Sequence, residues 1–342
     1  MNDEQSKRLR HSRDTEPGYT RRRQGRYWAY FDEDGKRVTD RAEIDRLNAL
    51  ALPPAYTDAW FCRDANGHLQ ATGRDARGRK QYRYHADFRL RRDKSKYAGC
   101  LEFGEALPKL RARVEKDLRK RKLDRDTVLA AVIRLLDKEY IRVGNEEYAR
   151  ANKSFGATTL RDRHLTTVGG KLKMRFPGKH GIMKEVTITD RSLKRVVSKC
   201  QDLPGQALFQ YINGDGVPQA VTSSDVNDYI RDATGGEFTA KHFRTWAASV
   251  IFYEQLLAKE EDRRLSLRTA LEPVAEALGN TVAISRKSYV HPKLIEALQE
   301  RPDDPLGSPA PQRARRRLSA AESGFLKFLR RRRRASAGKA AA

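Results

Sequence analysis

The residues of this chain that could carry chemistry are four polar or cationic side chains and one tyrosine. Arg142 stands in the segment YIRVGN, Lys179 in PGKHG, and Arg244 in KHFRTW. Asn280 follows a glycine, and Tyr289 lies in SRKSYVHP. Guanidinium and ammonium groups stay charged at neutral pH, so the set suits an anionic substrate. Taken singly, each residue also has an ordinary explanation, as a helix-end cation, a surface or loop residue, or a packing tyrosine.

Other catalytic signatures are missing from the sequence. No G-x-x-x-x-G-K-[ST] phosphate loop occurs, which disfavours an ATP-driven motor. Neither a Cys/His cluster at zinc spacing nor an H-E-x-x-H segment is present, and no pair of acids stands out at the spacing of a magnesium site. We therefore expect chemistry without a metal ion, a nucleotide or any other cofactor.

Composition narrows the class of partner. The 342 residues include 70 Lys+Arg against 45 Asp+Glu, a formal net charge of +25, which predicts a polyanionic partner such as nucleic acid. No apolar run approaches the roughly 20 residues that span a bilayer, and the first residues do not resemble a secretory signal. Three widely spaced cysteines, Cys62, Cys100 and Cys200, argue against a disulfide framework and favour a reducing cytoplasm.

The elements that must position these residues fall into four parts. Residues 1–25 are polar and predict a disordered basic arm, and residues 26–98 predict a β-rich domain. That domain should hold a hairpin at Asp34–Gly35 and a short helix within residues 40–51. Residues 99–300 predict a mainly helical catalytic domain, and residues 301–342, with 12 basic and 3 acidic residues, predict a disordered basic tail.

Within residues 99–300 the apolar pattern has the period of helices, interrupted by one hairpin. Asp126 or Thr127 can cap a strongly apolar helix, and residues 171–176 alternate perfectly before a turn at residues 177–181. Further helices are predicted at residues 192–200, 223–233, 239–257, 268–278 and 292–300. The expected fold class is α+β, with a small β-rich domain before a mainly α-helical one that carries a β-hairpin.

In their order and spacing these segments resemble the type IB DNA topoisomerases, most closely the short poxvirus-type and bacterial branch. The resemblance covers about residues 25 to 301, and Arg-Val-Gly at Arg142 and the Gly-Lys hairpin tip at Lys179 carry it. Lys-x-x-Arg-Thr-aromatic at Arg244 and Ser-basic-basic-x-Tyr at Tyr289 complete the set. The poxvirus enzymes have histidine where this chain has Asn280, whereas other bacterial members have asparagine.

The resemblance implies a role for each residue. Tyr289 would attack a DNA phosphodiester, form a 3′-phosphotyrosyl link and free a 5′-hydroxyl. Arg142, Arg244 and Asn280 would bind the non-bridging oxygens, and Lys179 would be the general acid that protonates the leaving oxygen. The cut strand would rotate, relaxing supercoils of either sign, before the 5′-hydroxyl reverses the reaction without ATP or metal.

The resemblance also implies a monomer that closes on double-stranded DNA as a C-shaped clamp, in the cytoplasm and associated with the nucleoid. Tyr82 and Tyr84 alternate along one predicted strand and so should share a face. That face could pack in the core of the β-rich domain or enter the major groove, and the surrounding Arg79, Lys80 and Arg83 favour DNA contact. The full set of predicted DNA contacts is Gln81, Tyr82, Tyr84, Tyr148, Thr159 and Lys241.

Two other functions compete with this interpretation. A tyrosine recombinase shares the catalytic fold, but it typically has His-x-x-Arg where this chain has Lys241-His-Phe-Arg244, and it begins with a helical domain. A non-enzymatic DNA-binding protein would explain the charge but not the hairpin at Lys179 or the segment at Tyr289. The Lys241 segment and the β-rich first domain favour a topoisomerase over a recombinase.

Overall fold

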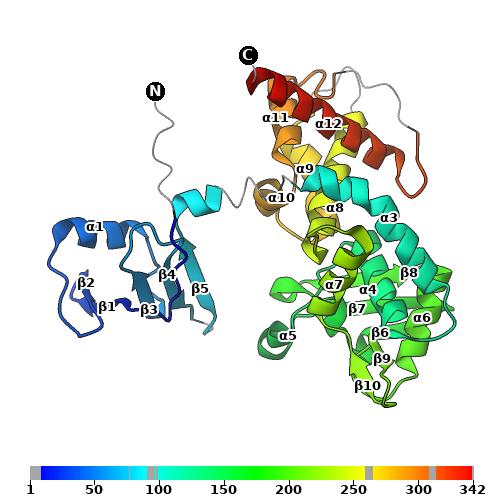
Figure 1. Ribbon diagram of the computed structural model, residues 1–342, viewed down its shortest axis with the longest axis horizontal. Coiled ribbons are helices and arrows are strands. Elements are labelled where there is room, and N and C mark those ends of the chain that lie inside the picture. The colour runs from blue at the N-terminus through cyan, green and yellow to red at the C-terminus, as the bar shows by residue number, and fades with distance from the viewer. Residues whose placement is uncertain are drawn as a thin grey trace. The chain divides into compact units, whose positions relative to one another are not determined.

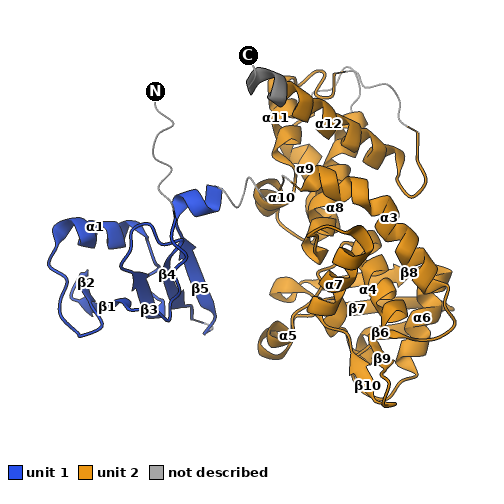
Figure 2. Ribbon diagram, viewed as in Figure 1, with its two compact units in different colours: residues 1–96 blue, residues 97–342 orange. Residues whose placement is uncertain are grey.

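The computed structural model describes residues 9–76, 78–90, 97, 99–258, 265–307 and 313–340. The chain divides into unit 1, residues 1–96, and unit 2, residues 97–342 (Figure 2). Each unit has a hydrophobic core of its own. A sheet dominates unit 1 and helices dominate unit 2, so the predicted α+β class is confirmed.

Unit 1 is built on a five-stranded antiparallel sheet with the order β2-β1-β3-β4-β5 (Figure 1). The strands are β1 (Gly18–Gln24), β2 (Tyr27–Phe31), β3 (Thr57–Cys62), β4 (Leu69–Arg74) and β5 (Lys80–Tyr84). Helix α1 (Arg41–Ala49) begins after Asp40, whose carboxylate accepts a hydrogen bond from the Ala42 amide. Its Leu47 lies in the same core as Tyr30 and Phe61, which confirms the short helix predicted here.

The first hairpin lies earlier in the chain than predicted. β1 pairs with β2 through a turn at Gly25, which has the positive φ of +59° that tight hairpin turns require. The turn at Asp34–Gly35 exists as well, but an isolated bridge between Phe31 and Arg37 joins its two sides instead of paired strands.

The prediction of a disordered arm over residues 1–25 is wrong for the described part of that segment. β1 is an interior strand of the sheet, between β2 and β3. Arg21 explains the order, because its guanidinium lies 4.1 Å from the centroid of the Trp28 ring. The same group donates hydrogen bonds to the carbonyls of Leu52 and Pro53. The polar composition of this segment does not reveal such contacts, and it resembles that of a disordered tail.

Unit 2 consists mainly of helices packed around a large core. The helices are α3 (Cys100–Leu118), α4 (Arg125–Glu139), α5 (Glu146–Asn152), α6 (Arg191–Gln201), α7 (Ser223–Thr234), α8 (Ala240–Leu257), α9 (Leu267–Leu278), α10 (Val282–Ser288), α11 (Pro292–Glu300) and α12 (Ala320–Ala340). The strands are β6 (Leu165–Val168), β7 (Lys171–Pro177), β8 (Met183–Ile188), β9 (Gln210–Ile212) and β10 (Pro218–Ala220). None of the described helices combines the length and the apolar character needed to cross a membrane.

The predicted apolar helix is α4, and it lies at the centre of unit 2. Val128 and Val132 are fully buried, and α4 contacts α3, α6, α7 and α8. Its N-terminal cap is Asp124 and not Asp126 or Thr127, because the Asp124 carboxylate accepts the Thr127 amide at 2.8 Å. The predicted hairpin is β7–β8, in a three-stranded sheet with the order β6-β7-β8.

The prediction of a disordered tail over residues 301–342 is wrong for residues 320–335, which belong to α12. Phe325, Leu326, Phe328 and Leu329 are buried in the core of unit 2. Helix α12, which is red in Figure 1, packs against α8 and α3. The five arginines that follow Leu329 dominate the composition of this segment, so its apolar residues did not lead to a predicted helix.

Charged side chains attach α12 to the rest of unit 2. The guanidinium of Arg111 on α3 lies 2.8 Å from a carboxylate oxygen of Asp137 and 2.7 Å from one of Glu322. The indole Nε1 of Trp246 on α8 donates to Glu322 at 3.0 Å. This network joins α3, α4, α8 and α12, and its charges are paired as burial requires.

Candidate active site

Four of the five residues predicted to carry the reaction meet in unit 2. Arg142 lies in the loop after α4, Arg244 in the first turns of α8, Asn280 in the turn after α9, and Tyr289 at the end of α10. These elements are brought together by the packing of α8 against α4 and α9, and of α10 against α9.

Arg244 is buried, with 4% of its surface exposed. Its Nη1 donates to the carbonyl of Tyr140 and its Nη2 donates to the carbonyl of Leu278 at 2.9 Å. Burial, and then the nearby charge of Arg142, lower the pKa of Arg244 to about 10. Its Nε is buried without a hydrogen-bond partner in the described structure, which leaves a donor for a bound anion.

Asn280 is oriented by Arg142. The Arg142 Nη2 donates to the Asn280 Oδ1 at 2.9 Å, so the amide oxygen is already used. The amide nitrogen Nδ2 is buried and has no partner among the described residues. A buried donor of this kind needs an explanation, and an oxygen atom of a substrate would supply it.

Tyr289 is half-buried, and two guanidinium groups act on its hydroxyl. Burial is the largest influence and opposes ionisation, but the charges of Arg244 and Arg142, and hydrogen bonds to both, together outweigh it. The net result is a lowered pKa of Tyr289, which makes the phenolate easier to form. The Arg244 Cζ also lies 5.1 Å from the centroid of the Tyr289 ring.

The backbone after Tyr289 is held to α8 by Ser249. The Ser249 Oγ accepts the His291 amide at 3.0 Å and donates to the Thr245 carbonyl at 2.8 Å. The His291 ring is buried, and burial lowers the pKa of His291 to about 4, so the ring is neutral. Its Nδ1 accepts the Lys293 amide at 3.2 Å at the start of α11. Sequence reasoning assigned no role to Ser249, which lies outside the recognised segments, or to His291, although His291 stands two residues after Tyr289.

Lys179 is the fifth predicted residue, and the structure does not join it to the other four. It is exposed in the short turn η3 (Lys179–Gly181) at the tip of the β7–β8 hairpin. Among the described residues, no hydrogen bond or ion pair connects it to Arg142, Arg244, Asn280 or Tyr289.

The predicted DNA contacts of unit 1 lie on β5. Tyr82 and Tyr84 share a face, with ring centroids 6.1 Å apart and an angle of 12° between the ring planes. Tyr82 is 48% exposed, which leaves its ring open to a partner. Gln81 points to the other face, where its Nε2 donates to the Asp75 carboxylate at 2.9 Å.

The predicted contacts in unit 2 differ in exposure. Tyr148 on α5 is 59% exposed, and Lys241 in the first turn of α8 is exposed as well. Thr159 is buried instead, and its Oγ accepts the Gly156 amide at 2.9 Å and donates to the Gly156 carbonyl at 3.1 Å. These two bonds stabilise the conformation of its own loop.

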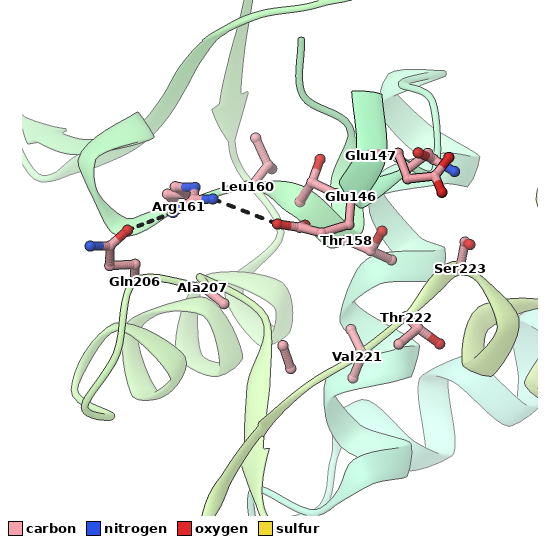
Figure 3. A pocket seen from close by; sticks show the side chains of 13 residues that line it. Glu146, Glu147, Thr158, Leu160, Arg161, Gln206, Ala207, Val221, Thr222 and Ser223 are labelled. Atoms are coloured by element: carbon pink, nitrogen blue, oxygen red, sulfur yellow. Dashed lines mark hydrogen bonds and ion pairs between the residues drawn. The ribbon is translucent and has the colours of Figure 1, made fainter. Parts of the chain in front are cut away.

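Thr159 also lines a pocket of about 560 Å³ that contains none of the four catalytic candidates. Figure 3 shows Arg161 in this pocket between Gln206, its hydrogen-bond partner at 2.5 Å, and Glu146, its ion-pair partner at 3.7 Å. Within the described part of the chain, no group of three His, Cys, Asp or Glu side chains could hold a metal ion.

Comparison with known protein families identifies two matching regions. Residues 85–304 match the family model of the eukaryotic DNA topoisomerase I catalytic core. Residues 27–75 match the family model of the bacterial DNA topoisomerase IB N-terminal domain.

Individual relatives extend over most of the chain. DNA topoisomerase 1B of Acanthamoeba polyphaga mimivirus is 32% identical over 84% of this chain and 89% of its own length. DNA topoisomerase 1B of vaccinia virus (strain Copenhagen) is 20% identical over 80% of this chain and 90% of its own length. Among solved structures, a XerH site-specific recombinase bound to its difH substrate matches with a TM-score of 0.37 and 16% identity, covering 56% of this chain and 50% of the recombinase. That last similarity is too low to bear on the function.

Proposed function

The chain belongs to the type IB DNA topoisomerases, and from this premise we propose which of its residues carry the reaction. As a family member it is an isomerase that changes the topology of DNA. In our proposal the Tyr289 hydroxyl loses its proton to water, and the phenolate oxygen attacks a backbone phosphorus atom. A bond from the tyrosine oxygen to phosphorus forms, the bond to the 5′ oxygen breaks, and the strand is left with a 3′-phosphotyrosyl link and a free 5′-hydroxyl.

The observation that carries this proposal is the contact of Tyr289 with Arg244 and Arg142. Their two positive charges lower the pKa of the tyrosine despite its burial, which favours the attacking phenolate. The same guanidinium groups, with the unpartnered Nδ2 of Asn280, can donate to the non-bridging oxygens as negative charge develops. Donors that are already fixed in place need no rearrangement at the moment of reaction.

Lys179 is the general acid in this proposal. The leaving 5′ oxygen needs a proton, and a lysine ammonium group can donate one. Because Lys179 is exposed at the hairpin tip, the tip has to approach the phosphate when DNA binds. The reverse reaction returns this proton to Lys179 as the 5′-hydroxyl attacks the phosphotyrosine.

The partner is double-stranded DNA. Beyond the catalytic residues, its proposed contacts are Tyr82, Tyr84, Gln81, Tyr148 and Lys241. The net charge of +25 supports affinity that rests mainly on phosphates and falls with salt. We place the chain as a monomer on the nucleoid DNA of the cytoplasm. Mass measurement of the protein bound to a short duplex would test the monomer.

The decisive experiment is relaxation of a supercoiled plasmid in EDTA without nucleotide. The cations of the site replace a metal ion, and the phosphotyrosyl link conserves the energy of the broken bond, so we expect relaxation of both positive and negative supercoils. The plasmid carries no recombination site, which separates this activity from that of a recombinase. A strict requirement for Mg²⁺ or ATP would contradict the mechanism.

A further inference from the structure

Lys184 occupies a position on the β7–β8 hairpin where an apolar residue is expected. Side chains alternate between the two faces of a strand, so Lys184 shares a face with Val186 and Ile188. Both of these are buried, and Lys184 itself is half-buried. Phe176, its partner across the hairpin, is also buried. A lysine on the inward face has a cost in desolvation that a surface lysine does not have.

The ammonium group of Lys184 reaches the end of α9. Its Nζ donates to the carbonyl of Ala277 at 3.2 Å, in the last turn of the helix, where the helix dipole favours a cation. The side chain passes directly over Gly279, because a Cβ atom at that position would lie 2.6 Å from the Lys184 Cε and 3.0 Å from its Nζ. Gly279 has a positive φ of +60° and immediately precedes Asn280.

Three cations therefore converge on residues 277–280 from three different elements. Lys184 of β8 binds the Ala277 carbonyl, Arg244 of α8 binds the Leu278 carbonyl, and Arg142 binds the Asn280 side chain. Burial, followed by the charges of Arg244 and Arg142, lowers the pKa of Lys184. Among the described residues, burial and these two cations act on Lys184, and no carboxylate offsets them.

We propose that Lys184 is a positioning residue of the cleavage reaction. It fixes the turn at Gly279 so that the Nδ2 of Asn280 faces the reacting phosphate, and it joins that turn to the hairpin whose tip carries Lys179. The inference rests on the function proposed above, in which Asn280 binds a non-bridging oxygen. It assigns the role to a lysine that does not itself touch the reacting atoms.

The test is single-turnover cleavage of a short duplex by Lys184→Met. This change keeps the length and apolar stem of the side chain but removes its charge and its hydrogen bond to Ala277. We expect cleavage to slow by roughly 10-fold to 100-fold, since small misplacements of a catalytic group cost about that much. Lys171→Met is the matched control, because Lys171 is an exposed lysine at the start of the same hairpin. The control should cleave at the parent rate.

Binding of the duplex, measured in a Tyr289→Phe background, should not change with Lys184→Met beyond the change seen with Lys171→Met. A positioning role thus predicts a slower rate of cleavage with an unchanged affinity for the duplex. Thermal unfolding checks that Lys184→Met is folded. If it is not, Lys184→Gln, which keeps a polar group at this half-buried position, replaces it.

A double-mutant cycle with Asn280→Ala identifies the group through which Lys184 acts. If Lys184 positions Asn280, the double variant should cleave about as slowly as Asn280→Ala alone. Independent, multiplying effects would overturn the proposal, and so would a Lys184→Met rate equal to that of Lys171→Met. Failure of the proposed function is a different result, because it would appear as a covalent adduct formed by Tyr289→Phe.

Discussion

Arg142 and Asn280 are 138 positions apart in the sequence, yet the Arg142 Nη2 donates to the Asn280 Oδ1 at 2.9 Å. This bond decides which end of the amide is left for a substrate. The oxygen already accepts from Arg142, and Nδ2 has no partner among the described residues. An asparagine can therefore do at this place what an N–H of histidine would do, provided that the arginine holds it.

Substitutions of Asn280 should rank by their ability to donate. Asn280→Ala should slow cleavage by roughly 10²–10³, the usual cost of one lost oxyanion donor. Asn280→His should keep much of the rate, because a ring nitrogen can donate. Asn280→Asp should be worse than Ala, since its carboxylate would face negative charge and offer no donor. Single-turnover cleavage of one duplex gives the ranking, and an Ala variant at the parent rate would make Asn280 an ordinary loop residue.

The pH dependence of cleavage should reflect the lowered pKa of Tyr289. We expect the rate to rise with pH and to level off below the ordinary tyrosine pKa of ~10. Arg142→Ala removes a positive charge that favours the phenolate, so the pKa of Tyr289 should rise and the ascending limb should move to higher pH. Single-turnover rates measured across the alkaline range check this shift. An unmoved limb would mean that the tyrosine does not titrate in it.

Tyr289→Phe should abolish the covalent adduct while duplex binding stays nearly intact. The hydroxyl is the nucleophile, whereas affinity comes from contacts with phosphates. Denaturing gels measure the adduct and a salt titration measures binding. Tyr253 is an unsuitable substitute nucleophile, because it is 1% exposed and burial raises its pKa. An adduct in the Phe variant would nevertheless show that another residue attacks.

Phe325 should matter for stability although it lies in the strongly basic C-terminal region. Its side chain is fully buried, so Phe325→Ala should lower the free energy of unfolding by about 3–5 kcal/mol. Lys327→Ala, on the exposed face of the same helix, is the control and should change it little. Removal of all residues after Arg301 should prevent unit 2 from folding cooperatively. A truncated chain that unfolds like the full chain would contradict the packing of α12.

Acid should weaken the network around Glu322. Burial opposes its ionisation most strongly, but the hydrogen bond and charge of Arg111, with hydrogen bonds from the Ser319 amide and Trp246, together lower the pKa of Glu322. A carboxylate with a lowered folded-state pKa stabilises above its unfolded pKa of ~4.3, and this stability is lost as pH falls through the folded pKa. Urea unfolding at neutral pH and below about pH 4 should therefore show a smaller pH-dependent loss for Glu322→Gln than for the parent. Glu105→Gln, which breaks an exposed pair with Arg330, should behave like the parent.

The sequence is sufficient to predict which residues gather at the candidate site, because they stand in short segments of fixed order. Arg142, Arg244, Asn280 and Tyr289 were predicted together, and the structure brings all four into one place. The helices and the β7–β8 hairpin were predicted because their apolar residues repeat with the periods of regular structure. Such periodicity is a property of short segments, so it can be recognised in a single sequence.

What sequence reasoning missed depends on contacts between distant segments. Lys184 looks like one more lysine of a basic strand until its inward face and its contact with Ala277 are known. Residues 18–24 and 320–335 look like charged tails, because the carbonyls of Leu52 and Pro53 that bind Arg21, and the Arg111 guanidinium that pairs with Glu322, lie elsewhere in the chain. A charged segment whose partners are far away in sequence is easily taken for a solvated one.

The packing of α12 on α8 also sets an order of events during synthesis. The ribosome makes α8, with Arg244, long before it makes residues 320–335. Until those residues emerge, Trp246 and Tyr253 lack the Phe325 ring, which lies 5.2 Å and 6.0 Å from theirs in the finished protein. We therefore expect a chain still under translation to be unable to cut DNA. A half-made enzyme would then leave no broken strands behind it.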